Sequence, residues 1–477
     1  MNLLHISSEM APYAKTGGLG DVVGALPRYL ARRGHDVRAF IPLYDTVDTT
    51  RLDLEPLISP MTFDLGPHRI VTKIFRDRDN PTAYFVHCPG LYGRGSIYTH
   101  NGDEHLRFLA LSVAALTACQ HMRFSPDVIH CHDWQASMVP LLLKVRFGWD
   151  RLFQGSRTLL TIDNMNYQGG FSSDIVPDLG IDGSEHLLHQ ELLAQGRVNF
   201  LLHGILYADG VSTVSPTYAH EIQTSRFGAG MDPFLRTRSS TVVGILNGVD
   251  YEEWSTETDP HIPFHYSADD LSGKEKNKVA LLQAMGLPYV QGVPLIGVVS
   301  RMAGQKGFDL VPGVLPGILA GRDVQLVALG SGESRLEGIF HRLQQYFPRQ
   351  VSYYRGFSNP LAHFIEAGAD IFLMPSAYEP CGLNQMYSLR YGTIPVVHRT
   401  GGLADTVRQV NPATGDGTGF VFDHHDEAGL RWALTMALRC YRNRPLWRKL
   451  IANAMAMDYS WEQQCRIYEE LYSRLMS

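Results

Sequence analysis

The chain has 477 residues, 44% of them hydrophobic and 19% charged, and a formal net charge of −6. This length predicts two or three domains, each with its own core. The negative charge argues against binding to nucleic acid or to an anionic membrane, so an anionic ligand must meet local positive charge.

The cysteines and the N-terminal residues both bear on the cellular compartment of the protein. The six cysteines form no C-x-x-C pair and no regular framework. Residues 1–6 lack the basic region and the long apolar run of a signal peptide, and no run is long enough to span a bilayer. We therefore expect reduced thiols in a cytoplasmic protein.

Short apolar strands alternate with helical stretches along the first half of the chain. The predicted strands are residues 3–7, 36–41, 127–131, 158–162 and 210–214. The predicted helices are residues 19–33, 104–121, 134–147 and 187–207. Such alternation predicts an α/β fold with parallel sheets and helices on both faces.

The pattern restarts after Ser240. The predicted strands are then residues 242–246, 293–300, 324–329, 351–355, 370–374 and 394–398. A stretch rich in Asp, Pro and His separates the halves, and residues 461–476 form a final amphipathic helix. We place the first domain at residues 1–245, the second at 246–455 and a terminal helical segment at 456–477.

Two similar Gly-rich turns each follow a strand region and open a helix. They are KTGGLGDVV at residues 15–23 and RTGGLADTV at residues 399–407. Glycine lets backbone N–H groups approach an anion, and the helix dipole adds to the attraction. A lone Gly-Gly pair recurs by chance, whereas this longer match, preceded by a cation, favours a ligand-binding role.

A third loop, residues 300–307, adds positive charge after a predicted strand. Arg301 can grip two phosphate oxygens at once, and Lys306 acts as a point charge. Each cation alone is more often a solvated loop charge. Together with Lys15, they predict a site that neutralises a diphosphate.

Polar clusters close three strands, at residues 130–134, 161–169 and 375–383, where open α/β sheets bind ligands. The run His130-Cys131-His132 invites a metal interpretation. Alternate residues of a strand point to opposite faces, however, and no second ligand cluster is evident, so no metal is expected. The D-x-D at residues 77–79 is expected to be a solvated turn.

These motifs resemble those of bacterial glycogen synthases and plant starch synthases, nearly end to end. The motifs are KTGGL (15–19), DV (21–22), HDW (132–134), Asn164, YQG (167–169), VSPTY (214–218), LNGVD (246–250), QKG (305–307), EPCGL (379–383) and RTGGLAD (399–405). The resemblance implies the GT-B fold, two Rossmann-like doubly wound domains facing a central cleft. It also implies that the final helix returns to the first domain and that the domains close on the ligands.

The family reaction is transfer of glucose from ADP-glucose to the non-reducing end of an α-1,4-glucan such as glycogen, with retention of configuration. The resemblance implies no metal and no other cofactor. Four residues are implied in catalysis: Arg301, Lys306, Glu379 and Asp163. Donor binding is implied for Arg301, Lys306 and Glu379. It is also implied for Lys15, Gly17, Gly18, Asp21, Asn247, Tyr387, Thr400, Gly401 and Gly402. Acceptor binding is implied for Tyr98, Asp133, Trp134 and Asn164, with helix packing as the alternative for Trp134.

One position departs from the family pattern in an important way. The family has His directly before Asn164, where it is thought to contact the transferred glucose, and this chain has Asp163. Aspartate still accepts a sugar hydrogen bond, but it is shorter and carries the wrong charge beside a diphosphate. Smaller departures are Ala377, where Arg is common, and Phe357, where Tyr is common.

Two other functions compete with that of a synthase. A glucan-binding or regulatory paralogue with little turnover is suggested by Asp163. A dinucleotide oxidoreductase is suggested only by Gly-rich turns, and it fails because no G-x-G-x-x-G follows the first strand.

Overall fold

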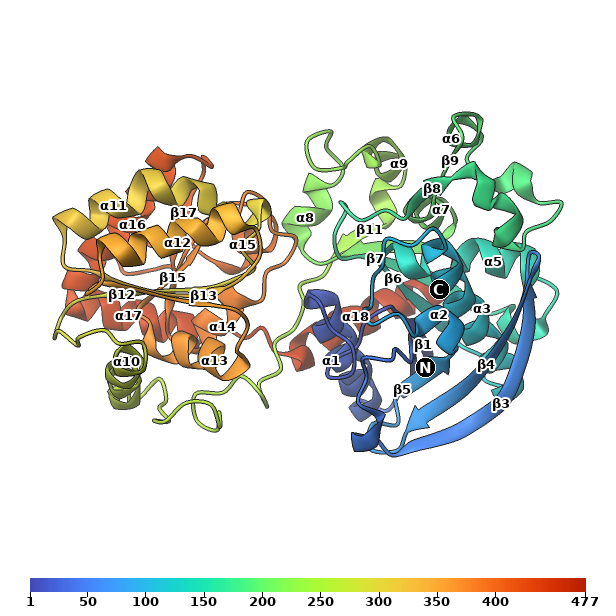
Figure 1. Cartoon of the computed structure of the whole chain (residues 1–477), viewed down its shortest axis with the longest axis horizontal. Helices are drawn as coiled ribbons and strands as arrows, with labels where there is room; N and C mark the ends of the chain where they lie inside the picture. The colour runs from blue at the N-terminus through green and yellow to red at the C-terminus, as the bar shows by residue number, and fades with distance from the viewer. The chain divides into compact units, whose positions relative to one another are not determined.

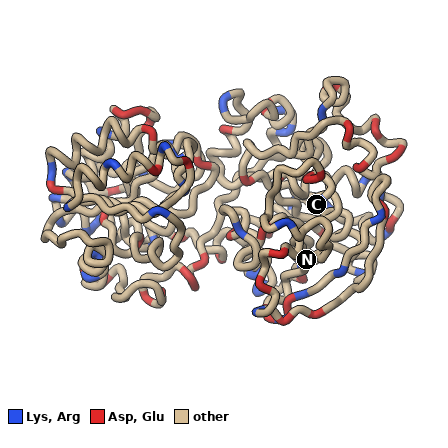
Figure 2. Tube along the Cα trace, viewed as in Figure 1, with Lys and Arg blue, Asp and Glu red and all other residues tan.

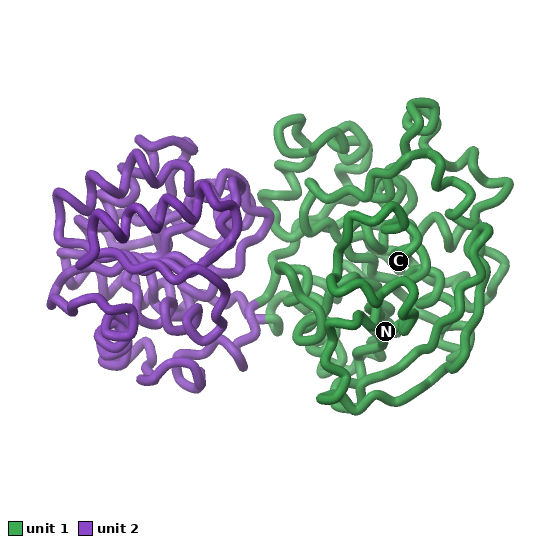
Figure 3. The backbone as a smooth tube through the Cα atoms, viewed as in Figure 1, with its two compact units in different colours: residues 1–248, 461–477 green, residues 249–460 purple.

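The computed structural model describes residues 1–477, which divide into two compact units (Figure 3). Unit 1 comprises residues 1–248 and 461–477, and unit 2 comprises residues 249–460. The chain re-enters unit 1 at helix α18 (Trp461–Met476). The sequence had suggested boundaries after residues 245 and 455.

Unit 1 is built on a nine-stranded sheet in the order β11-β10-β7-β6-β1-β2-β5-β4-β3 (Figure 1). The parallel strands are β1 (Asn2–Ile6), β2 (Asp36–Pro42), β5 (Ala83–His87), β6 (Val128–His132), β7 (Arg157–Ile162), β10 (Gly210–Thr213) and β11 (Val242–Gly244). Strand β1 is central, and successive connections run outward from it on both sides. This is the doubly wound pattern, and its switch point lies between β1 and β6.

A long antiparallel hairpin extends one edge of this sheet, and the sequence analysis missed it. Strand β3 (Leu54–Leu65) pairs with β4 (His68–Asp77), which pairs with β5. Its sequence follows the alternation typical of a strand with one solvent-exposed face. Ile70 and Ile74 are buried, while Val71 is exposed. The expected uniform α/β alternation hid it.

The helices of unit 1 are mostly where the sequence predicts them. They are α1 (Gly18–Arg32), α2 (Pro89–Tyr92), α3 (Glu104–Met122), α4 (Asp133–Ala136), α5 (Val139–Arg146), α6 (Gln190–Ala194), α7 (Phe200–Tyr207), α8 (Pro216–Glu221), α9 (Asp232–Thr237) and α18. The single helix predicted at residues 187–207 is wrong. Gly196, at φ 73°, ends α6, and strand β9 (Arg197–Asn199), paired with β8 (Gly170–Ser172), precedes α7.

Unit 2 contains a six-stranded parallel sheet in the order β14-β13-β12-β15-β16-β17. The strands are β12 (Leu295–Val299), β13 (Gln325–Gly330), β14 (Val351–Arg355), β15 (Ile371–Met374), β16 (Ile394–His398) and β17 (Phe420–Phe422). The order reverses between β12 and β15. The loops that follow these two strands therefore flank the position where doubly wound sheets bind ligands.

Helices cover both faces of this second sheet (Figure 1). One face carries α11 (Val311–Gly321), α12 (Ser334–Tyr346) and α16 (Glu427–Arg442). The other carries α10 (Ser272–Ala284), α13 (Asn359–Gly368), α14 (Asn384–Arg390) and α17 (Arg444–Met455). The short helix α15 (Gly401–Thr406) follows β16.

Charge and hydropathy agree with the composition. Basic and acidic residues are interspersed along both units (Figure 2), so neither unit carries a long stretch of one sign. All six cysteines are buried, and none of them forms a disulfide. No helix combines the length and the apolar character that crossing a bilayer requires.

Helix α18 is bound to unit 1 by an apolar core. Trp461, Tyr468 and Tyr472 are almost fully buried and lie in the cluster that contains Leu26 and Leu30 of α1. Gly248 makes this possible, because a Cβ there would lie 2.4 Å from Cδ2 of Trp461. The last sixteen-residue helix is therefore part of the core of unit 1.

We expect Trp461→Ala to lower the free energy of unfolding of unit 1 by about 3–5 kcal/mol, because it removes a large buried ring. Urea denaturation followed by circular dichroism measures this loss. Trp149→Ala is the matched control in unit 1: that residue is 75% exposed, and removal of its ring should cost less than about 1 kcal/mol. Equal losses in the two variants would contradict the assignment of α18 to the core.

Candidate functional site

The loop after β1 is held in place by a buried carboxylate, Glu9, which is 3% exposed. Its two oxygens accept hydrogen bonds from the Thr16 N–H at 2.6 Å, the Thr16 hydroxyl at 2.7 Å and the Gly17 N–H at 3.2 Å. The Tyr98 hydroxyl donates a further bond at 2.6 Å. Glu9 therefore fixes both the first Gly-rich turn and Tyr98.

This arrangement changes the role expected for the first Gly-rich turn. The N–H groups of Thr16 and Gly17 donate to Glu9 and are not presented to an anion. A Cβ at Gly17 or Gly18 would meet no atom within 4 Å, so the turn is open on that side. Lys15, which is half-exposed, pairs with Asp21 at 2.6 Å. The positive charge available to an anion here is that of Lys15, which Asp21 partly neutralises.

Asp133 joins the ends of β6 and β7. It begins α4 at φ 54°, an uncommon conformation for a non-glycine residue. Its Oδ1 accepts the N–H groups of Asp163 at 2.7 Å and of Asn164 at 3.5 Å. These bonds hold the backbone of the β7 loop against the β6 loop, so three sequence-predicted site residues lie together.

The electrostatics of this pair are unusual. Oδ2 of Asp163 is buried and has no hydrogen-bond partner. Burial, then the neighbouring charges of Asp133 and Glu9, raise the pKa of Asp163 well above its usual range. Burial also raises the pKa of Asp133, although its two backbone hydrogen bonds oppose that shift.

Trp134 packs inside unit 1, as the alternative interpretation had it. Its ring is 9% exposed and makes edge contacts with Phe108 at 5.1 Å and with Phe171 at 5.7 Å between centroids. A Cβ at Gly169 would lie 2.3 Å from the indole, so the backbone also covers it. Tyr167, which is 56% exposed, is the more accessible aromatic ring of this region.

In unit 2, the loops after β12 and β15 bring Lys306 and Glu379 together. The Lys306 ammonium lies 2.6 Å from Oε2 of Glu379, which also accepts the Ser376 hydroxyl at 3.0 Å. Gly307, at φ 69°, permits this approach, since a Cβ there would lie 1.9 Å from the carbonyl oxygen of Pro375. Arg301 is exposed, and its side chain makes no hydrogen bond or ion pair.

The second Gly-rich turn supports the same loop. The Gly402 N–H donates to the carbonyl oxygens of Glu379 and Pro380, both at 3.1 Å. A Cβ at Gly401, where φ is 42°, would lie 2.0 Å from the Glu379 carbonyl oxygen. The expectation that the Gly402 N–H faces a phosphate is therefore not met. These glycines allow the backbone around Glu379 to pack closely, while Thr400 is buried beside them.

Sequence reasoning missed two contributors. Glu9 belongs to no motif that was singled out, and only folding places it against residues 15–17. The loop Gly330–Glu333 follows β13 and opens α12, and the Glu333 carboxylate accepts the Gly304 N–H at 2.8 Å. The pair of glycines at 330 and 332, after a strand and before a helix, was the available signal.

Two predicted donor residues are enclosed. Tyr387 is 9% exposed and stacks on Trp254 with centroids 3.7 Å apart. Asn247, in unit 1, is 4% exposed, and its buried Oδ1 has no hydrogen-bond partner. Both remain predictions as ligand-binding residues.

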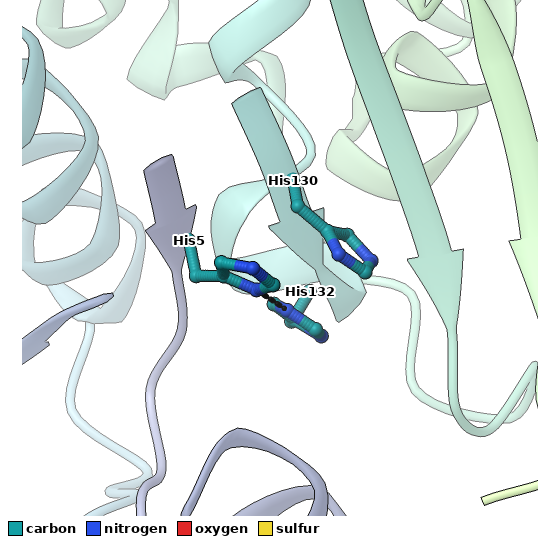
Figure 4. A group of neighbouring side chains, drawn as sticks. All are labelled: His5, His130 and His132. Atoms are coloured by element: carbon teal, nitrogen blue, oxygen red, sulfur yellow. Dashed lines mark hydrogen bonds between the residues drawn. The ribbon is translucent and has the colours of Figure 1, made fainter. Parts of the chain in front are cut away.

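The His-Cys-His run forms a cluster that the strand argument misjudged (Figure 4). His130 and His132 share a face, since they are two positions apart on β6, and His5 of β1 joins them. The rings of His130 and His132 stack at 4.1 Å and 26°, so their in-plane lone pairs do not converge on one point. His130 also bonds to Tyr472 at 2.9 Å and Thr161 at 2.5 Å. Burial lowers the pKa of all three imidazoles, and the cluster is a neutral hydrogen-bonded group.

The D-x-D motif is also better ordered than expected. Asp77 ends β4, is 3% exposed, and accepts the Tyr13 hydroxyl at 2.6 Å and the Asp79 N–H at 3.1 Å. Its carboxylate is therefore hydrogen-bonded within the fold, and the motif is not the solvated turn that the sequence predicts.

Two doubly wound units with a Lys–Glu pair and an unpaired arginine at a switch point define a nucleotide-sugar glycosyltransferase of the GT-B fold. Family models agree: "starch synthase catalytic domain" matches residues 2–237 and "glycosyl transferases group 1" matches residues 288–457. The chain belongs to the glycogen and starch synthase family.

Individual relatives cover the whole chain. A glycogen synthase of Anaeromyxobacter sp. is 45% identical, with 100% of this chain and 99% of that protein aligned. A glycogen synthase of Streptococcus pneumoniae is 42% identical over 100% of both. The catalytic domain of starch synthase IV from Arabidopsis thaliana, solved with ADP and acarbose, has a TM-score of 0.91 and 35% identity, covering 100% of this chain and 99% of that one.

We expect Glu9→Ala to speed amide hydrogen exchange of residues 15–18 by at least about tenfold, since hydrogen bonds to a charged group contribute about 1.5–3 kcal/mol. Exchange followed by mass spectrometry of the peptide containing this turn measures the effect. Glu333→Ala, which removes the acceptor of the Gly304 N–H in unit 2, should leave this peptide unchanged. Unaltered exchange in Glu9→Ala would show that Glu9 does not hold the turn.

Proposed function

We propose that this protein is a glycogen synthase that transfers glucose from ADP-glucose to the non-reducing end of an α-1,4-glucan, with retention of configuration. The observation that carries this proposal is the arrangement at the unit 2 switch point. Lys306 and Glu379 pair there, and Arg301 is left without a partner. Glycogen synthase relatives at 42–45% identity and a starch synthase solved with ADP support the choice of reaction and donor.

Arg301 and Lys306 stabilise the leaving group. As the bond between the glucose C1 and the β-phosphate oxygen breaks, negative charge gathers on ADP. Cations fixed in advance stabilise that charge more in the transition state than in the ground state. Arg301 is available for a bidentate grip because it has no competing partner. These two cations supply the charge that a metal supplies elsewhere, so the reaction is proposed to need no metal and no other cofactor.

Glu379 serves the transferred glucose. Lys306 and Ser376 hold its carboxylate, and the close backbone packing at Gly401 and Gly402 holds its loop. An oriented carboxylate accepts sugar hydroxyls and favours the positive charge that develops on the sugar ring. The acceptor 4-hydroxyl attacks C1, and its proton passes to an oxygen of the departing phosphate.

Unit 1 contributes the remaining contacts. Lys15, Asp21 and the open side of Gly17 and Gly18 are proposed for the donor, together with Asn247. Tyr98, Asp133 and Asn164 are proposed for the glucan. Trp134 supports this region by packing, and Tyr167 is the exposed ring that suits a sugar face. Tyr387, stacked on Trp254, is proposed to border the nucleotide.

The experiment is release of ADP from ADP-glucose, with and without glycogen, beside a parallel assay with UDP-glucose. We expect glycogen-dependent release with ADP-glucose and little with UDP-glucose. Arg301→Ala should lower kcat/KM about 100-fold or more, which corresponds to about 3 kcal/mol of lost transition-state stabilisation. Its melting temperature should not change, because the side chain is exposed and makes no hydrogen bond or ion pair, and Arg335→Ala, also exposed, is the control. No glycogen-dependent release would overturn the proposal and favour a glucan-binding paralogue, the candidate suggested by Asp163.

We expect Asp163→His to raise the rate of glucosyl transfer about tenfold, the worth of one added hydrogen bond to a sugar hydroxyl in the transition state. The imidazole is longer than the carboxyl group, so it reaches a sugar hydroxyl that the shorter side chain does not. Asp64→His, the same exchange at an exposed position of β3, should leave the rate unchanged. A purified Asp163→His enzyme no faster than the parent would contradict this role for position 163.

A further inference from the structure

Three carboxyl groups meet at the unit 1 switch point, and they come from three different strand ends. Glu9 follows β1, Asp133 follows β6 and Asp163 follows β7. Glu9 and Asp133 are 3% and 7% exposed, and Oδ2 of Asp163 is fully enclosed. Like charges this close in a buried place are unfavourable, and such groups reduce the cost by retaining a proton.

The hydrogen bonds decide which group holds the proton. Glu9 accepts four bonds, from Thr16, Gly17 and Tyr98, so both of its oxygens already have donors. Asp133 accepts two backbone N–H groups at Oδ1, which favours its ionised form. Oδ2 of Asp163 accepts none, so protonating it costs no hydrogen bond.

No cation offsets this negative charge. The charges that act on Asp163 are those of Asp133 and Glu9. Burial keeps the imidazoles of His5, His130 and His132 neutral by lowering the pKa of each. Lys15 on the adjoining turn pairs with Asp21, and the hydroxyl of Tyr218 on α8 accepts the Met165 N–H.

We propose that Asp163 keeps its proton beside the ionised Asp133, so that Asp163 acts as a neutral carboxylic acid during glucosyl transfer. This inference rests on the proposed function. A neutral acid does not repel the diphosphate of the donor, whereas an ionised carboxylate at this position would. Loss of that proton at higher pH places two adjacent carboxylates in the site and slows the reaction.

The sign of the stability effect follows from the same proton. Folding raises the pKa of Asp163 above its unfolded value of about 4. The folded protein then binds more protons than the unfolded chain between the unfolded and folded pKa values, and its stability falls as pH rises through that window. A variant that cannot ionise at position 163 does not lose this stability.

The test compares wild type with Asp163→Asn, an amide of the same shape, over pH 5 to 9. For wild type, we expect kcat/KM with ADP-glucose and glycogen to fall about tenfold per pH unit above the pKa of the pair. In Asp163→Asn that decline disappears. In Asp133→Asn it moves to lower pH, because Asp163 has lost its nearest like charge.

Melting temperatures give a readout that does not depend on activity. The advantage of Asp163→Asn over wild type should be small at pH 5 and reach about 3 °C or more at pH 8. Asp64→Asn, an exposed carboxylate of unit 1, should show no such trend. Parallel melting profiles of wild type and Asp163→Asn would overturn the proposal that Asp163 keeps a proton in the folded protein. A protein that is inactive with ADP-glucose but still shows the stability trend would refute the proposed function. It would not refute the proposal that Asp163 keeps its proton.

Discussion

The central residues of both candidate sites depend on one topological constraint, the reversal of strand order next to the first strand of each unit. In unit 1, β2 and β6 lie on opposite sides of β1, and in unit 2, β13 and β15 lie on opposite sides of β12. Chain connections leave these strand ends in opposite directions, so the loops separate and their backbone groups stay accessible. Glu9 and Asp133 occupy this place in unit 1, and Lys306 and Glu379 occupy it in unit 2.

The two Gly-rich turns share a sequence and differ in physical role. At residues 399–403, the glycines bring backbone to within contact of the Glu379 loop, and the Gly402 N–H is used inside the protein. At residues 15–19, the glycines leave one side open, and a buried carboxylate takes the N–H groups on the other. One turn supports the Glu379 carboxylate, which is proposed to act in catalysis, whereas the other is open on one side and carries a cation. A shared motif therefore indicates a shared local shape, and its neighbours determine the chemistry.

The sequence predicted the fold class and family correctly, because strand periodicity and ordered motifs are local signals. It placed β14 (Val351–Arg355), β16 (Ile394–His398) and α18 at their observed bounds. It missed the β3–β4 hairpin, whose alternation was overlooked, and it misread residues 187–207, where Gly196 breaks the apolar pattern. In the site, Lys306 and Glu379 were found through their motifs. The role of Glu9 and the packing of Trp134 could not be predicted from the sequence, because both depend on contacts between segments distant in the chain.

The distribution of charge fits the two kinds of ligand that a glucan synthase handles. Unit 2 offers Arg301 without an ion-pair partner and Lys306 paired with Glu379, two cations where a diphosphate is proposed to bind. Unit 1 offers Glu9, Asp133 and Asp163, and a glucan is neutral and rich in hydroxyl donors that carboxyl oxygens accept well. A third ionised carboxylate would add nothing for a neutral sugar and would oppose binding of the anionic donor. Histidine at position 163 avoids that conflict by being neutral when buried, and an aspartate there avoids it only by keeping its proton.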